Sequence, residues 1–224
     1  MPDPVKRRVA FLAQKSRNVE DFSAFGSSKQ PPKNFVSNSS LIALAKDVHI
    51  IMEITIIQKK VCLLGSFAVG KTSLVRRFVY NSFEEKYLST IGVAISRKQT
   101  RVNEGRIVSM IIWDLAGSDE FNGKHASYLQ GAAGALLVCD LTRADTFTII
   151  QEYYAKLKSV SPEASIVLIG NKTDIVAVSE ESEAQIGRLA MQFNAPYLFT
   201  SAKAGVNVEE CFQALAEQMI NTSA

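Results

Sequence analysis

The fold is decided by residues 61–72, VCLLGSFAVGKT. Four apolar residues, typical of a buried strand, run directly into the pattern G-x-x-x-x-G-K-[ST]. In such a loop the glycines let the backbone curl so that successive amides point inward at a phosphate, and the following helix adds its positive end. The sequence therefore predicts a phosphate-binding loop made of Gly65, Ser66, Phe67, Ala68, Val69, Gly70, Lys71 and Thr72.

Two residues carry the chemistry of this loop. Lys71 is expected to reach β- and γ-phosphates as a point charge, and the hydroxyl of Thr72 suits a ligand of Mg²⁺. An ordinary strand-turn-helix corner also uses glycine where φ is positive. Such a corner, however, has no need of Lys and Thr after the second glycine, so we interpret the pair as functional.

From Met52 onward, short apolar runs alternate with longer amphipathic segments, which is typical of an α/β fold. We expect a doubly wound, mostly parallel six-stranded sheet between two layers of helices, with one edge hairpin turning near Gly105. The expected strands are Glu53 to Leu64, Val93 to Asn103, Ile107 to Asp114, Gly134 to Asp140, Ser165 to Asn171 and Pro196 to Thr200. The expected helices are Lys71 to Tyr80, Thr146 to Ser159, Ser182 to Phe193, which Ser179 is placed to cap, and Val208 to Ile220.

Polar residues follow three of the other strands. Asp114 ends the run from Ile107 and is followed by Leu-Ala-Gly, so its carboxylate is placed to hold Mg²⁺ through a water, and Gly117 is small enough to approach a γ-phosphate. Asp-x-x-Gly alone is a common turn, but here it accompanies a phosphate loop.

Residues 171–174, NKTD, and 201–203, SAK, stand at the ends of the last two expected strands. The carboxylate of Asp174 suits guanine, because it can accept hydrogen bonds from N1–H and the exocyclic amine, which adenine does not offer. Asn171 either contacts the O6/N7 edge of the base or ties the loops together, and the stem of Lys172 suits the face of the ring. These residues predict a guanine site.

Composition excludes several other classes of protein. The 224 residues are 47% hydrophobic and 21% charged, no apolar run is long enough to span a membrane, and Cys62, Cys139 and Cys211 show no metal or disulfide spacing. We therefore expect a cytoplasmic protein.

Residues 1–51 hold 8 of the 25 Lys and Arg but only 4 of the 22 Asp and Glu, so the net charge of +3 belongs to this segment and does not indicate nucleic-acid binding. We expect a poorly ordered basic extension over 1–51, unless translation starts at Met52, and one domain over 52–224.

The phosphate loop, the residues 113–117 (WDLAG), NKTD and SAK resemble the small Ras-like GTPases. Residues 86–93 (KYLSTIGV), 128–134 and 140–143 (DLTR) are most similar to the Rab branch. The resemblance covers residues 52–224 and implies the small G domain of the P-loop NTPases. It implies a switch that binds GTP or GDP with Mg²⁺ and hydrolyses GTP to GDP and phosphate.

The resemblance also implies roles for individual residues. Thr90 would be a ligand of Mg²⁺ beside Thr72 and Asp114, and would touch the γ-phosphate through its amide, as Gly117 would. Lys71, Thr90 and Gly117 would then be the catalytic positions. Guanine would be held by Phe83, Asn171, Lys172, Asp174, Ser201, Ala202 and Lys203. Segments 83–93 and 115–130 would be switches that bind effector and regulatory proteins.

The sequence departs from the family at three places. Ser118 stands where the family usually has a Gln that orients the attacking water, and Phe67 and Ala68 stand where the family tends to have small residues. We therefore expect slow hydrolysis. The C-terminal residues, INTSA, contain no prenylation motif, so we expect no stable membrane anchor. We also expect a monomer. A GTP-bound scaffold with negligible hydrolysis is the alternative, whereas NKTD argues against a P-loop kinase of small metabolites.

Overall fold

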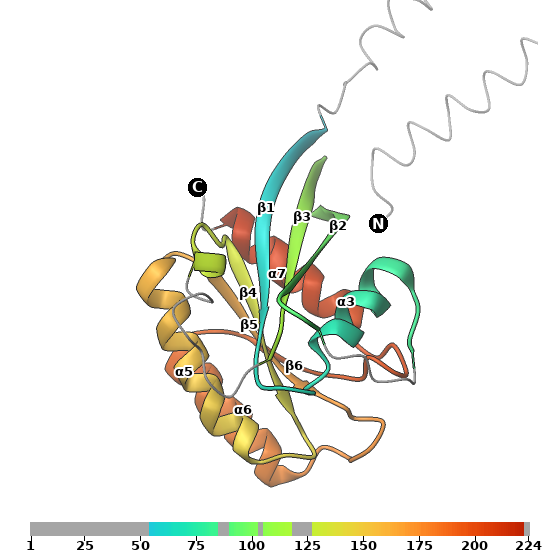
Figure 1. Cartoon of the computed structure of the whole chain (residues 1–224), viewed down its shortest axis with the longest axis vertical. Coiled ribbons are helices and arrows are strands. Elements are labelled where there is room, and N and C mark those ends of the chain that lie inside the picture. The colour runs from blue at the N-terminus through green and yellow to red at the C-terminus, as the bar shows by residue number, and fades with distance from the viewer. Residues whose placement is uncertain (1–53, 85–89, 103–104, 118–126, 222–224) are drawn as a thin grey trace, which may run out of the picture. The chain divides into compact units, whose positions relative to one another are not determined.

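The computed structural model describes residues 54–84, 90–102, 105–117 and 127–221 (Figure 1). The predicted N-terminal extension, residues 1–51, lies outside the described residues. The described residues contain a six-stranded sheet in the order β2-β3-β1-β4-β5-β6. Neighbouring strands are parallel except for β2 and β3, which form the edge hairpin predicted near Gly105. The expected doubly wound, mostly parallel α/β fold is confirmed.

The observed elements lie close to the predicted ranges. The strands are β1 (Thr55–Leu64), β2 (Val93–Val102), β3 (Arg106–Leu115), β4 (Gly134–Asp140), β5 (Ser165–Asn171) and β6 (Tyr197–Thr200). The helices are α3 (Lys71–Tyr80), α5 (Asp145–Val160), α6 (Glu180–Phe193) and α7 (Val208–Asn221). Residues 127–129 are also helical.

The differences from prediction fall at the ends of elements. Helix α6 starts at Glu180 instead of Ser182, because Ser179 and Ser182 form a capping box in which each side chain bonds the backbone N–H of the other. Ser179 is thus confirmed as the cap. Strand β3 is one residue longer at each end than predicted, since Arg106 pairs with both neighbouring strands. Helix α5 extends by one residue at each end, and Pro196 precedes β6.

The sheet separates two apolar layers. In β1, Val61 and Leu63 face a core formed with α3 and α7, whereas Cys62 and Leu64 face a core formed with α5 and α6. Every residue of β4 and β5 is buried, as expected for central parallel strands covered on both faces. Because β1, β3, β4, β5 and β6 are parallel, their carboxyl ends meet at one edge of the sheet.

The three cysteines are free and buried, and burial raises the pKa of Cys62 and Cys139 to about 12. They are packing residues of the two cores. Within the described ranges, the helices lack the combination of length and hydropathy that a membrane crossing needs.

The central strands predict where the fold is most sensitive. Leu136 of β4 is fully buried, so Leu136→Ala is expected to lower the free energy of unfolding by about 2–5 kcal/mol through lost contacts and a cavity. Met191→Ala, at a position of α6 that is 82% exposed, is the control and should change it by less than about 0.5 kcal/mol. Urea unfolding followed by circular dichroism measures both, and equal losses would contradict this account of the core.

Candidate functional site

A pocket of about 530 Å³ lies at the carboxyl edge of the sheet. It is lined by residues of the phosphate loop, the end of β3, and the loops after β5 and β6. Its lining residues are Phe67, Ala68, Gly70, Lys71, Thr72, Ser73, Arg76, Phe83, Glu84, Thr90, Leu115, Gly117, Asn171, Lys172, Asp174, Ile175, Ala202 and Lys203. The sequence-predicted residues Gly65, Ser66, Val69, Asp114 and Ser201 do not line it but adjoin those that do.

The glycines of the phosphate loop are required by close approaches of other groups. Gly65 has φ 143° and Gly70 has φ 101°, which few other residues adopt. A Cβ at Gly65 would collide with the carbonyl oxygen of Val138, and one at Gly70 would collide with the side-chain amide of Asn171. The loop is therefore closely packed between β4 and the residues that end β5.

Lys71 is buried at the centre of the loop. Its Nζ donates to the carbonyl oxygens of Gly65 at 2.7 Å and Ser66 at 2.8 Å. Burial lowers its pKa to about 8, an effect that Asp114 partly opposes. A desolvated ammonium that is held only by neutral carbonyls is suited to receive an anion.

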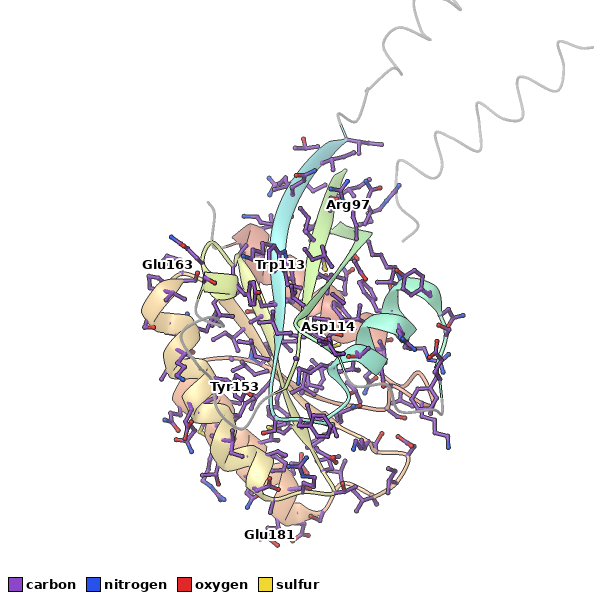
Figure 2. All side chains as sticks on the ribbon, viewed as in Figure 1. Arg97, Trp113, Asp114, Tyr153, Glu163 and Glu181 are labelled. Carbon is purple, nitrogen blue, oxygen red and sulfur yellow. The ribbon has the colours of Figure 1, made fainter. Side chains whose placement is uncertain are left out.

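Three oxygen-bearing side chains converge beside Lys71. Asp114 lies near the end of β3 (Figure 2). The Thr72 hydroxyl donates to Oδ2 of Asp114 at 2.6 Å, and its oxygen lies 2.6 Å from the hydroxyl of Thr90, which is 3.5 Å from the same carboxylate. Burial raises the pKa of Asp114, and its Oδ1 is buried without a partner among the described residues. One orphaned carboxylate oxygen with two hydroxyls is an oxygen donor set that fits Mg²⁺, which otherwise keeps waters and phosphate oxygens as ligands.

Gly117 closes the site from the side of β3. A Cβ at this position would lie 2.6 Å from the amide nitrogen of Phe67, 2.6 Å from the carbonyl oxygen of Ser66 and 2.7 Å from Nζ of Lys71. Only glycine lets the two loops lie this close together. The backbone after β3 is consequently within reach of any group that Lys71 holds.

Asn171, at the end of β5, joins three loops. Its Nδ2 donates to the carbonyl of Val69 at 2.9 Å, and its Oδ1 accepts from the hydroxyl of Thr200 at 3.0 Å and from the amide of Ala202 at 3.3 Å. Of the two roles considered for Asn171, these contacts favour tying the loops together over contact with a base edge.

The residues after Asn171 form the other half of the pocket. Oδ1 of Asp174 accepts from the hydroxyl of Ser201 at 2.6 Å, which in turn accepts from the amide of Ala204 at 2.9 Å. Lys172, at φ 76°, forms an ion pair with the buried Asp140 at 2.6 Å. This arrangement orients the carboxylate of Asp174 and lays the stem of Lys172 along the pocket.

The other residues predicted to contact the base come from two segments that line the pocket, the one after α3 and the one after β6. Phe83 is half-buried against the core of α3 and α7 and lines the pocket. The carbonyls of Ala202 and Lys203 accept from Arg77 of α3, at 3.0 and 2.6 Å. The pairing of Arg77 with residues 125 and 126 positions away carries no local sequence signal.

Several lining residues were not predicted. Arg76 follows Thr72 by one helical turn, and this spacing is the sequence signal that could have placed Arg76 at the pocket. Arg76 also forms an ion pair with Glu84. Ser73, Leu115 and Ile175 have no distinctive pattern. Ser118, with residues 119–126 and 85–89 of the two predicted switches, lies outside the described residues.

Comparison with known proteins agrees with this geometry. The model of the Ras family matches residues 60–221. The chain is 36% identical over 166 residues to the Ras-related protein Rab-1D of Dictyostelium discoideum, covering 74% of this chain and 81% of that one. It is 35% identical over 162 residues to Rab-13 of Rattus norvegicus (72% and 79%) and 34% identical over 166 residues to Rab-22A of Homo sapiens (74% and 85%).

The lowered pKa of Lys71 predicts a pH dependence of stability in the ligand-free protein. Between pH 8 and the unfolded value of 10.5, the unfolded chain holds a proton on Lys71 that the folded chain has released, so stability rises with pH. The free energy of unfolding of the wild type minus that of Lys71→Met should increase by about 2 kcal/mol from pH 8 to pH 10. Urea unfolding in EDTA measures it, and a difference that stays flat would show that burial does not shift this pKa.

Proposed function

Since the chain belongs to the Ras family, with relatives among the Rab proteins, and is thereby a GTP-binding switch, we propose that it binds GTP or GDP with Mg²⁺ and hydrolyses GTP slowly to regulate a partner protein. Segments 83–93 and 115–130 are the proposed contacts with effector and regulatory proteins. We further propose that the protein is a cytoplasmic monomer. Its buried free thiols support a location in a reducing compartment.

The observation that carries this proposal is the convergence of Thr72, Thr90 and Asp114 beside Lys71. The three residues come from α3, from the segment before β2, and from β3, yet their oxygens lie within 3.5 Å of one another. Thr72, Thr90 and Asp114 would hold Mg²⁺. The ion would neutralise charge on the phosphates.

The phosphates would be bound by the loop Gly65, Ser66, Phe67, Ala68, Val69, Gly70, Lys71 and Thr72, together with Thr90 and Gly117. Lys71 would exchange its bonds to the carbonyls of Gly65 and Ser66 for bonds to phosphate oxygens. This exchange places a full positive charge, within a desolvated site, where negative charge develops as the γ-phosphate leaves. Lys71, Thr90 and Gly117 are thus the proposed catalytic positions.

Guanine would lie between Phe83, Lys172 and the residues of the last two loops. Asp174, oriented by Ser201, would accept from N1–H and the exocyclic amine. Ala202 and Lys203 would support the base from the loop that Arg77 anchors, and Asn171 would hold that loop against the phosphate loop. A site with a carboxylate at this position disfavours adenine.

Two residues support the slow rate. Ser118 is too short to orient the attacking water as a Gln would. The Phe67 side chain is 45% exposed at the pocket, where it would obstruct an arginine supplied by an activating protein. These residues also favour the second candidate function, a GTP-bound scaffold with negligible hydrolysis.

The nucleotide that accompanies the purified chain tests the function. After denaturation, chromatography should identify a guanine nucleotide in near-stoichiometric amount. GDP would support a hydrolysing switch and predominant GTP would support the scaffold. Adenine nucleotide, or none in the presence of Mg²⁺, would refute the guanine assignment.

The position of Ser118 predicts a gain of function. Ser118→Gln should raise single-turnover GTP hydrolysis by about tenfold to a hundredfold, because the longer amide can orient water. Ser118→Ala is the matched control and should keep the wild-type rate. If Ser118→Gln leaves the rate unchanged, the loss of Gln is not the cause of slow hydrolysis.

A further inference from the structure

Side-chain donors bind four carbonyls of the phosphate loop. Lys71 holds those of Gly65 and Ser66, and Asn171 holds that of Val69. The carbonyl of Phe67 accepts from the guanidinium of Arg143 at 2.7 Å; this residue ends the DLTR segment, for which no part in the site is predicted from the sequence. Arg143 does not line the pocket and therefore acts on the loop from outside it.

The direction of a carbonyl decides the direction of the next amide. In a trans peptide the C=O and the following N–H point in opposite directions. The carbonyl of Phe67 belongs to the same peptide group as the N–H of Ala68. When Arg143 draws this carbonyl outward, the N–H of Ala68 points the other way, toward the pocket that Phe67 and Ala68 line.

This peptide group needs such a restraint. Ala68 has φ 62°, a left-handed conformation that is unfavourable for a residue with a Cβ. Glycine would adopt it without cost, but here the chain has Ala. An external bond to the preceding carbonyl offsets the tendency of the peptide to rotate.

Arg143 is itself fixed in place. It follows β4, 76 positions after Phe67, and its second guanidinium nitrogen donates to Oδ2 of Asp145 at 2.8 Å. The bond from Arg143 is the main cause that lowers the pKa of Asp145. Asp145 starts α5, so the guanidinium is anchored to a helix at one end and to the loop at the other.

We infer that Arg143 is a positioning residue of the phosphate loop, which directs the amide of Ala68 at the β-phosphate by holding the carbonyl of Phe67. The inference rests on the proposed function, because it assigns the loop a diphosphate or triphosphate ligand. A charged hydrogen bond of this kind corresponds to roughly tenfold in a binding constant.

The test compares Arg143→Ala with Arg188→Ala in the full chain. Arg188 is an exposed arginine of α6 that does not line the pocket, so its removal costs the same charge without touching the loop. Dissociation of fluorescent GDP in excess GDP and Mg²⁺ should be about tenfold faster in Arg143→Ala and unchanged in Arg188→Ala. Equal rates in the two variants would overturn the inference.

A second ligand separates positioning from general damage to the fold. GMP has no β-phosphate, so its affinity, measured by competition, should be the same in Arg143→Ala as in the wild type, while that of GDP falls about tenfold. Equal losses for GMP and GDP would mean that Arg143 only stabilises the fold. A wild-type chain that fails to bind GDP would overturn the proposed function and this inference together, whereas wild-type binding with an unaffected Arg143→Ala overturns the inference alone.

Discussion

The site depends on two buried groups of opposite charge, Lys71 and Asp114, whose hydrogen bonds compensate only in part for the loss of water. Burial lowers the pKa of Lys71 and raises that of Asp114, so the fold disfavours both charges. Lys71 bonds only neutral carbonyls, and one oxygen of Asp114 has no partner among the described residues. A nucleotide phosphate with Mg²⁺ would satisfy both groups at once. Because burial disfavours both charges, a ligand that pairs with them would stabilise the folded chain, so folding and ligand binding are expected to be coupled.

The local parts of this arrangement follow from the sequence. The bounds of α3, β4 and β5 are those predicted, because a glycine pattern or an unbroken apolar run marks them on both sides. The convergence of Thr72 with Asp114 also follows, since parallel strands bring their carboxyl ends to one edge. For the predicted elements, errors of one or two residues occur at helix and strand ends, where caps and strand register decide, whereas the short helical segment 127–129 was not predicted. The capping box at α6 is a case in which the cap was predicted but the helix start was not.

Contacts between distant side chains are what the sequence does not predict. Arg77 supports the loop after β6, and Arg143 holds the phosphate loop, but no motif or periodic spacing in the sequence predicts either contact. Both donate to backbone carbonyls, which every residue has, so no partner residue type identifies them. Asn171 was ambiguous for a related reason: an amide side chain suits a base edge and a carbonyl equally well, and only the packed loops distinguish the two.

The geometry also indicates how the state of the site reaches the surface. The hydroxyl of Thr90 contacts Thr72 and Asp114 at the proposed metal site, and the next residue, Ile91, is 93% exposed. Three residues after Thr90, at Val93, the chain enters β2, whose register against β3 is fixed along its whole length. The backbone between the metal site and the sheet is therefore short, and a change in the ligands of Thr90 must be absorbed within it. Ile91 is the apolar side chain on that segment, so a partner that bound it would respond to the occupancy of the proposed metal site.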